Sequence, residues 1–117
     1  VWNGGATELS GKHLLVLTTC GNPEDASKLA KTLVTRRLAA CVNRLEGIVS
    51  AYRWESAVRE DTEVLLLIKT TAERLGQVEA SIKELSSYEL PEILAVPIHS
   101  GSRDYLEWIA ASVDPEE

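Results

Sequence analysis

The chain has 117 residues, and its 12 lysines and arginines against 18 aspartates and glutamates give a formal net charge of −6. This length predicts one domain that is large enough to build its own core. The negative charge argues against nucleic acid as a partner, because such binding depends on cations that neutralise phosphates. The longest strongly apolar run, Val64 to Ile68, is far shorter than the roughly 20 residues that cross a bilayer, which argues against a membrane partner.

The amino-terminal residues 1–12 lack hydrophobic periodicity and contain several glycines, so we expect a flexible arm there. Residues 13–113 are predicted to form the single domain, followed by a tail at 114–117. Cys20 and Cys41 are too few and too far apart for a disulfide framework. We therefore expect a reducing compartment and a cytoplasmic location.

The first predicted elements are a strand and a helix. His13 to Cys20 is a short, apolar, partly β-branched run that is typical of a central strand. Asn22 followed by Pro23 is a strong helix start, because asparagine caps the first turn and proline suits the first helical position. Apolar residues at three- and four-residue spacing then predict a helix that ends near Arg37.

A long hairpin is predicted next. Ala39 to Tyr52 has a residue pattern typical of a strand, with Gly47 as a bulge or bend. Thr62 to Thr70 is again strongly β-forming, and the polar residues 55–61 are expected to close the hairpin. Strands this long exceed the reach of a compact chain of this size, so the hairpin should project, and its free edges predict an oligomer.

The last part of the domain predicts a helix, a strand and a final helix. Thr70 to Glu73 has the spacing of a capping box, and the helix that follows should end near Leu85. Glu92 to Ile98 is predicted as an edge strand because prolines stand at both ends. Ser102 is expected to cap a last short helix that reaches Val113.

The resulting order, β-α-β-β-α-β plus one helix, predicts an α+β protein with the ferredoxin-like split βαβ fold. Right-handed crossovers place the first and third strands in the centre, the fourth beside the first and the second beside the third. One sheet edge should then gather most of the chemistry-bearing side chains: Cys20, Tyr88, Glu89, Glu92 and, from the hairpin tip, Glu55, Glu60 and Asp61.

The candidate chemistry at that edge is sparse. Cys20 is interpreted either as a soft metal ligand or as a small buried hydrophobic residue, and Cys41 as core. The acids Glu60, Asp61 and Glu63 are interpreted as a solvated hairpin tip and receive no role in a site. His13 and His99 have no partner at zinc-ligand spacing and are expected at the surface or at strand ends.

No catalytic or cofactor motif stands out. Ser86 and Ser87 have no nearby histidine base, so they are interpreted as helix-terminal serines. An enzyme built on Tyr88 and its neighbouring carboxylates ranks last because no general base has a stated partner. No glycine-rich phosphate loop and no zinc-protease motif is found, so no organic cofactor is expected.

Four separated segments nevertheless resemble one family. They are TTCGNPEDASKLAKTLVTRRLAACVN (Thr18 to Asn43), IVSAYRWE (Ile48 to Glu55), EDTEVLLLIKT (Glu60 to Thr70) and YELPEILAVPI (Tyr88 to Ile98). In this order they resemble the CutA family of divalent-cation-tolerance proteins, over about residues 13 to 110. The resemblance implies a ferredoxin-like protomer in a homotrimer, with long hairpin strands pairing between subunits. It also implies a role in tolerance of copper and other divalent metal ions, and a binding module rather than an enzyme.

The resemblance further implies a copper site built from a cysteine at the end of the first strand, a histidine and a downstream acid. Cys20 matches the cysteine and Glu92 the acid, with Glu89 as a neighbour, whereas Ser86 and Ser87 stand where the family has His-Pro. A hydroxyl is a weaker ligand than imidazole, so Cu²⁺ or another divalent cation is expected to be weakly held. The alternative is a trimeric signalling or scaffold module that binds a small molecule or a protein at clefts between subunits.

Overall fold

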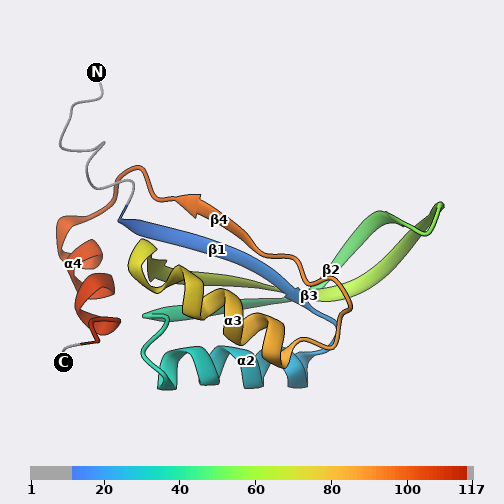
Figure 1. The fold of residues 1–117 in the computed structure, drawn as a ribbon. Helices are drawn as coiled ribbons and strands as arrows, with labels where there is room; N and C mark the ends of the chain where they lie inside the picture. Colours follow the sequence, from blue (N-terminus) through green and yellow to red (C-terminus); the bar gives the residue numbers. More distant parts are fainter. Residues whose placement is uncertain (1–11, 116–117) are drawn as a thin grey trace.

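A computed structural model describes residues 12–115, so most of the predicted arm and the last two residues of the tail lie outside the described residues. The sheet has the strand order β2-β3-β1-β4 with every neighbouring pair antiparallel, which confirms the predicted ferredoxin-like fold (Figure 1). The elements along the chain are β1 (His13–Cys20), α2 (Pro23–Thr35), β2 (Cys41–Trp54), β3 (Ala57–Thr71), η1 (Ala72–Arg74), α3 (Leu75–Leu85), β4 (Leu94–Pro97) and α4 (Arg103–Ser112).

Helix α2 begins as predicted and ends slightly earlier. The Asn22 side chain accepts a hydrogen bond of 2.8 Å from the Asp25 N–H, with Pro23 in the first turn. The helix stops at Thr35 because Arg37 takes the left-handed conformation with φ of 60°, which interrupts the helical hydrogen-bond ladder. The predicted end near Arg37 is therefore two residues late.

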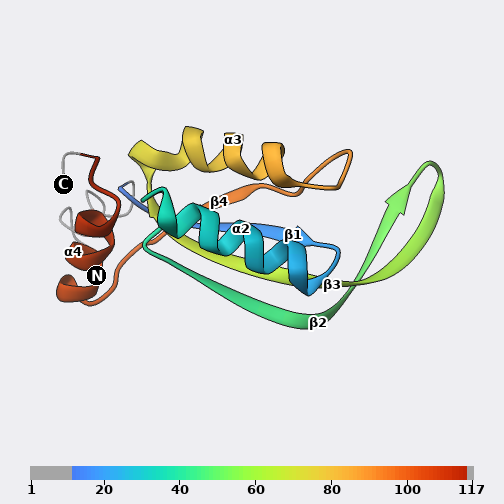
Figure 2. The same cartoon turned by 90° about the horizontal axis from the view of Figure 1, so that it is seen from below.

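The hairpin is longer than predicted, and its closing loop is shorter. Strand β3 begins at Ala57, and only Glu55 and Ser56 form the turn, with φ of 51° and 68°. The expected loop over residues 55–61 is wrong, because a two-stranded ribbon exposed on both faces carries polar residues as readily as a loop does. The bulge at Gly47 is confirmed by its φ of 78° and by the register shift between Leu45 and Ile48. The hairpin projects beyond the rest of the sheet in Figures 1 and 2.

One face of the sheet is covered by α2 and α3 (Figure 2). Inward-facing strand residues such as Val16, Leu66 and Ile68 are fully buried there, and each alternates with a less buried neighbour, as the period of a strand requires. The buried core of this layer comprises Leu14, Val16, Cys20, Ala26, Leu29, Leu33, Leu38, Ala39, Val64, Leu66, Ile68, Val78 and Ile82.

The opposite face of the sheet is apolar and carries no helix within residues 12–115. Cross-strand register places Leu17 opposite both Leu67 and Leu94, and these partners share this face. Leu94 is 56% exposed and Val96 is 45% exposed. The same alternation assigns further aliphatic residues to this open face, namely Leu15, Leu45 and Leu65.

Helix α4 packs at the end of the sheet where β1 begins (Figure 1). Nε2 of His13 donates to the carbonyl oxygen of Leu106 at 2.9 Å, and His13 is only 5% exposed. His13 begins β1, so the predicted strand-end position is confirmed, but the side chain is buried rather than at the surface. Ser102 caps α4 as predicted, because its side chain accepts from the Tyr105 N–H.

Two predicted boundaries in the second half of the chain are wrong. Thr70 caps no helix: it is fully buried, and its hydroxyl donates to the carbonyl oxygen of Leu38 at 2.7 Å. A turn of 3₁₀ helix precedes α3 instead. Strand β4 begins at Leu94 rather than Glu92, because pairing with β1 starts opposite Leu17. Among the described helices, none is long and apolar enough to cross a bilayer.

Candidate functional site

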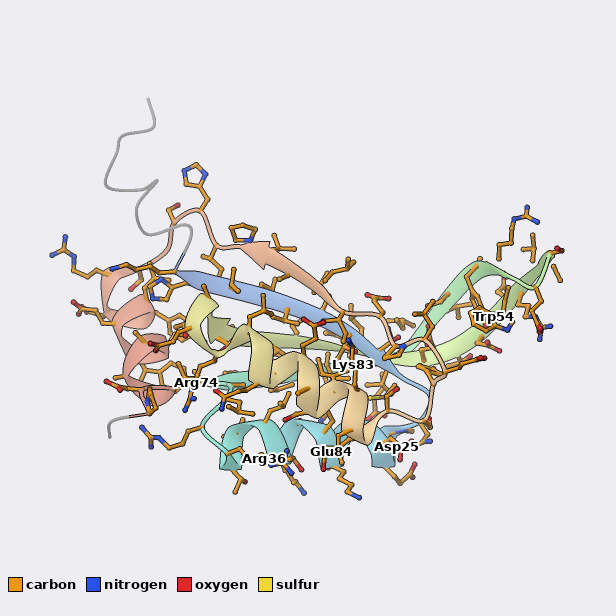
Figure 3. The ribbon with its side chains drawn as sticks, viewed as in Figure 1. Asp25, Arg36, Trp54, Arg74, Lys83 and Glu84 are labelled. Atoms are coloured by element: carbon orange, nitrogen blue, oxygen red, sulfur yellow. The ribbon has the colours of Figure 1, made fainter. Side chains whose placement is uncertain are left out.

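Three segments meet at the sheet edge where β1 ends: the projecting hairpin, the last residues of β1, and the irregular segment 86–93 between α3 and β4. Together they form an open groove of about 620 Å³. Figure 3 places Trp54 on the hairpin side of this edge and Asp25 at the start of α2. The groove is lined by Thr19, Ser50, Ala51, Tyr52, Arg53, Trp54, Arg59, Glu63, Ser87, Tyr88, Glu89, Leu90 and Glu92.

Two tyrosine–carboxylate pairs stand in or beside this groove. The Tyr88 hydroxyl donates to Oε2 of Glu63 at 2.6 Å, and the Tyr52 hydroxyl donates to the Asp61 carboxylate. Burial and then the Glu63 hydrogen bond raise the pKa of Tyr88. The Asp61 hydrogen bond is the main cause that raises the pKa of Tyr52. Both phenols are therefore donors at neutral pH.

Cys20 lies behind Tyr88 and outside the groove. Its side chain is 9% exposed and lines a small separate chamber, which Tyr88 also lines. Burial, followed by the negative charges of Asp25 and Glu63, raises the pKa of the Cys20 thiol to about 11. The thiol is consequently protonated at neutral pH, and a cation that binds its sulfur must displace a proton.

The structure brings two of the three predicted metal ligands into one groove. Glu89 and Glu92 are exposed and line it, whereas Cys20 lines the small chamber instead. Within residues 12–115, no three His, Cys, Asp or Glu side chains lie close enough together to hold a metal ion. A single chain therefore offers an incomplete ligand set, and Cys20, Glu89 and Glu92 stay a prediction.

The sequence interpretation missed the role of Glu63. This acid was assigned to a solvated hairpin tip, but it accepts the Tyr88 hydrogen bond and lines the groove. Glu55 and Glu60, which were expected at this edge, do not line the groove. The strand register explains this position, because Val64 pairs with Cys20 and so places Glu63 next to the end of β1.

Cys41 is also less buried than expected. It begins the edge strand β2, is half-buried rather than part of the core, and receives a contact of 3.9 Å from Nζ of Lys69. Both cysteines are free. Cys20 is thus the thiol with a small cavity beside it, and Cys41 serves as a comparison for experiments on it.

Comparisons with known proteins agree on one family. The profile described as "CutA1 divalent ion tolerance protein" matches residues 14–112. A protein of Thermus thermophilus named "Divalent-cation tolerance protein CutA" is 47% identical over 95 residues, which cover 81% of this chain and 92% of that protein. The solved structure of CutA1 from Oryza sativa has a TM-score of 0.86 at 37% identity, covering 92% of this chain and 98% of that one. The structure of the protein titled periplasmic divalent cation tolerance protein CutA from Archaeoglobus fulgidus has a TM-score of 0.85 at 35% identity, covering 87% of this chain and 99% of that one.

Proposed function

Because the chain belongs to the CutA1 family of divalent ion tolerance proteins, we propose that it is a homotrimeric binding protein that holds a divalent cation weakly at the groove edge of the sheet. The cation is Cu²⁺ or another divalent metal ion, and the ligands are Cys20, Glu89 and Glu92. The function needs no organic cofactor, nucleic acid, membrane or catalytic step. It is that of a binding protein rather than an enzyme.

The observation that carries this proposal is the arrangement of these ligands around Tyr88. Glu89 follows Tyr88 directly and lines the groove with Glu92, while Cys20 lines the small chamber that Tyr88 also lines. A thiolate with carboxylates suits a borderline cation such as Cu²⁺ or Zn²⁺. Weak binding is expected because the thiol must first lose its proton and because the remaining coordination positions are open to water or to a neighbouring subunit.

The open apolar face of the sheet supports the homotrimer. Leu17, Leu67 and Leu94 lie together on this face, which no described helix covers. Exposed apolar faces of this kind are uncommon in monomers and are typical of contacts between subunits. The unpaired outer edge of β2 offers a further contact, because free backbone groups can pair with another strand.

A calorimetric titration of the reduced protein with Zn²⁺, and with Cu²⁺ under argon, tests the cation site. The mass in solution is measured on the same samples. We expect Cys20→Ser to weaken the affinity for the cation by at least about tenfold. Mutating even a residue that only hydrogen-bonds to a metal ligand lowers metal affinity by about this factor. Cys41→Ser is the matched control and should titrate like the parent. Equal affinities of Cys20→Ser and the parent would remove Cys20 from the site.

The groove itself favours a second candidate function, a signalling or scaffold module that binds a small molecule or a protein. Its volume of about 620 Å³ falls in the range of small-molecule sites, about 300 to 1,000 Å³. Trp54 and Tyr52 supply apolar surface, and Arg59 and several acids line the same groove. A metabolite that raises the melting temperature in the presence of a chelator would favour this function over cation binding.

We propose a cytoplasmic location. Both cysteines are free, as a reducing compartment requires. Relatives named for other compartments, such as the periplasmic protein of Archaeoglobus fulgidus, make the location worth testing directly. Fractionation of the source cells, followed by immunodetection, decides between the compartments.

A further inference from the structure

Two cavities of very different size meet at Tyr88. One is the groove of about 620 Å³. The other is a small chamber that offers about 10 Å³ to the centre of a water molecule, which is room for about one water. Tyr88, Thr19 and Ser87 line both cavities. The chamber therefore adjoins the groove.

One residue that lines the chamber carries a buried hydroxyl without a protein partner. Thr18 is 1% exposed and lines the chamber, and its Oγ1 forms no hydrogen bond with any described residue. Cys20 and Asp25 line the same chamber, together with apolar residues such as Leu29. Buried hydroxyls are nearly always satisfied by protein or by an ordered water. The chamber thus suits one small guest that donates and accepts hydrogen bonds.

The position of Tyr88 is fixed from three sides. Its hydroxyl donates to Glu63 at 2.6 Å, and its backbone N–H donates to Oγ of Ser86 at 3.0 Å. The hydroxyl also lies 3.3 Å from the point that a Cβ on Gly21 would occupy. Since residues 86–93 form no regular element, the Glu63 hydrogen bond is the contact that ties the ring to the sheet.

We propose that the hydrogen bond between Tyr88 and Glu63 is a latch that closes this chamber, which holds one water molecule beside Thr18 and Cys20. When the latch opens, the chamber joins the groove and the water exchanges. Reagents and cations then reach the Cys20 sulfur. The role of the latch in cation binding rests on the proposed function. The latch itself can be tested without any metal, because access to Cys20 is measured with a thiol reagent.

The test uses methyl methanethiosulfonate, a small neutral thiol reagent, on the full chain carrying Cys41→Ser. The Cys20 thiolate attacks the sulfenyl sulfur, a new S–S bond forms, methanesulfinate leaves, and the thiol proton goes to the buffer. Mass spectrometry follows the gain of the methylthio group. The modification rate in urea gives the reference value for a fully accessible Cys20 thiol in the unfolded chain. The natural state of assembly is checked for each variant by its mass in solution.

Tyr88→Phe is the decisive variant, because it removes the hydroxyl that bonds to Glu63 but keeps the ring and every charge around Cys20. We expect the modification rate to rise by about tenfold, the effect of losing one hydrogen bond to a charged acceptor. Tyr52→Phe is the matched control: Tyr52 also donates to a carboxylate beside the groove but does not line the chamber. Its rate should stay within about twofold of the parent.

Two outcomes would overturn the latch. The first is equal rates in Tyr88→Phe and the parent. The second is an equal acceleration in Tyr52→Phe, which would indicate general loosening of the edge. A crystal structure with no electron density for a water molecule beside Thr18 Oγ1 would contradict the proposed bound water. If calorimetry finds no cation binding while Tyr88→Phe still accelerates modification, the cation proposal fails and the latch stands.

Discussion

The side chain of Thr70, at the end of β3, donates a hydrogen bond of 2.7 Å to the backbone carbonyl of Leu38, which follows α2 by three residues. Both residues are buried. Thr70→Val keeps the shape but leaves the Leu38 carbonyl unsatisfied, so we expect the free energy of unfolding to fall by about 1 to 3 kcal/mol. Urea unfolding at a fixed protein concentration measures the loss.

Thr70→Ser separates the hydrogen bond from the packing of the methyl group. It retains the hydroxyl and should cost only about 1 kcal/mol, the value of one buried methyl or methylene group. A Thr70→Val protein as stable as the parent would contradict the importance of this contact.

The hairpin turn offers a stabilising change. Glu55 and Ser56 both have positive φ, which is costly for residues with side chains. Asparagine followed by glycine is preferred in two-residue turns of this kind. The double change Glu55→Asn, Ser56→Gly should therefore raise the free energy of unfolding by about 1 kcal/mol. A double alanine variant keeps the strained backbone and should give no gain; a gain there would assign the effect to the lost side chains instead.

If the open apolar face of the sheet is the contact between subunits, a charge placed on this face should disrupt their association. Leu67 lies on this face opposite Leu17, and burying a leucine in an interface contributes about 1.5 to 3 kcal/mol. Leu67→Arg places a charge there and should convert the proposed trimer into smaller species, which sedimentation detects. Lys31→Glu, on the exposed side of α2, is the control and should leave the mass unchanged. A trimeric Leu67→Arg protein would show that the subunits meet elsewhere.

The Cys20 thiol predicts a pH dependence of stability. Its pKa rises from 9.0 to about 11 on folding, mainly through burial. Between these values the native state holds more protons than the unfolded chain, so the free energy of unfolding falls as the pH rises through this window. Below pH 9 the thiol is protonated in both states and contributes no slope. Urea unfolding at intervals from pH 8 to 11 should give a shallower decline for Cys20→Ser than for the parent. Parallel curves would contradict the raised pKa.

Short-range sequence patterns predicted the helices and strands well where the interactions that form them lie within one segment of the chain. The bounds of β1 and the caps at Asn22 and Ser102 were read from residue type and spacing alone. The hairpin turn was misplaced because polarity does not separate an exposed ribbon from a loop. Thr70 was misread because its hydroxyl bonds to a residue 32 positions away rather than to its own helix.

The candidate site was predictable in its location but not in its contacts. Strand order places Tyr88, Glu89 and Glu92 at the edge where β1 ends, and they lie there. The pairing of Tyr88 with Glu63 and the isolation of Thr18 depend on the register and on how residues 86–93 pass over Cys20. No spacing in the sequence encodes either of them.

The contact between His13 and α4 has a practical consequence for handling this protein. The hydrogen bond from His13 to Leu106 brings the start of β1 and the last helix together at one end of the sheet. The groove and the projecting hairpin lie at the other end (Figure 1). A tag or a surface anchor attached through either of these two neighbouring segments would leave the groove facing the solution. Surface-based binding measurements can thus immobilise the protein through the start of β1 or through α4 and present the same face to a ligand.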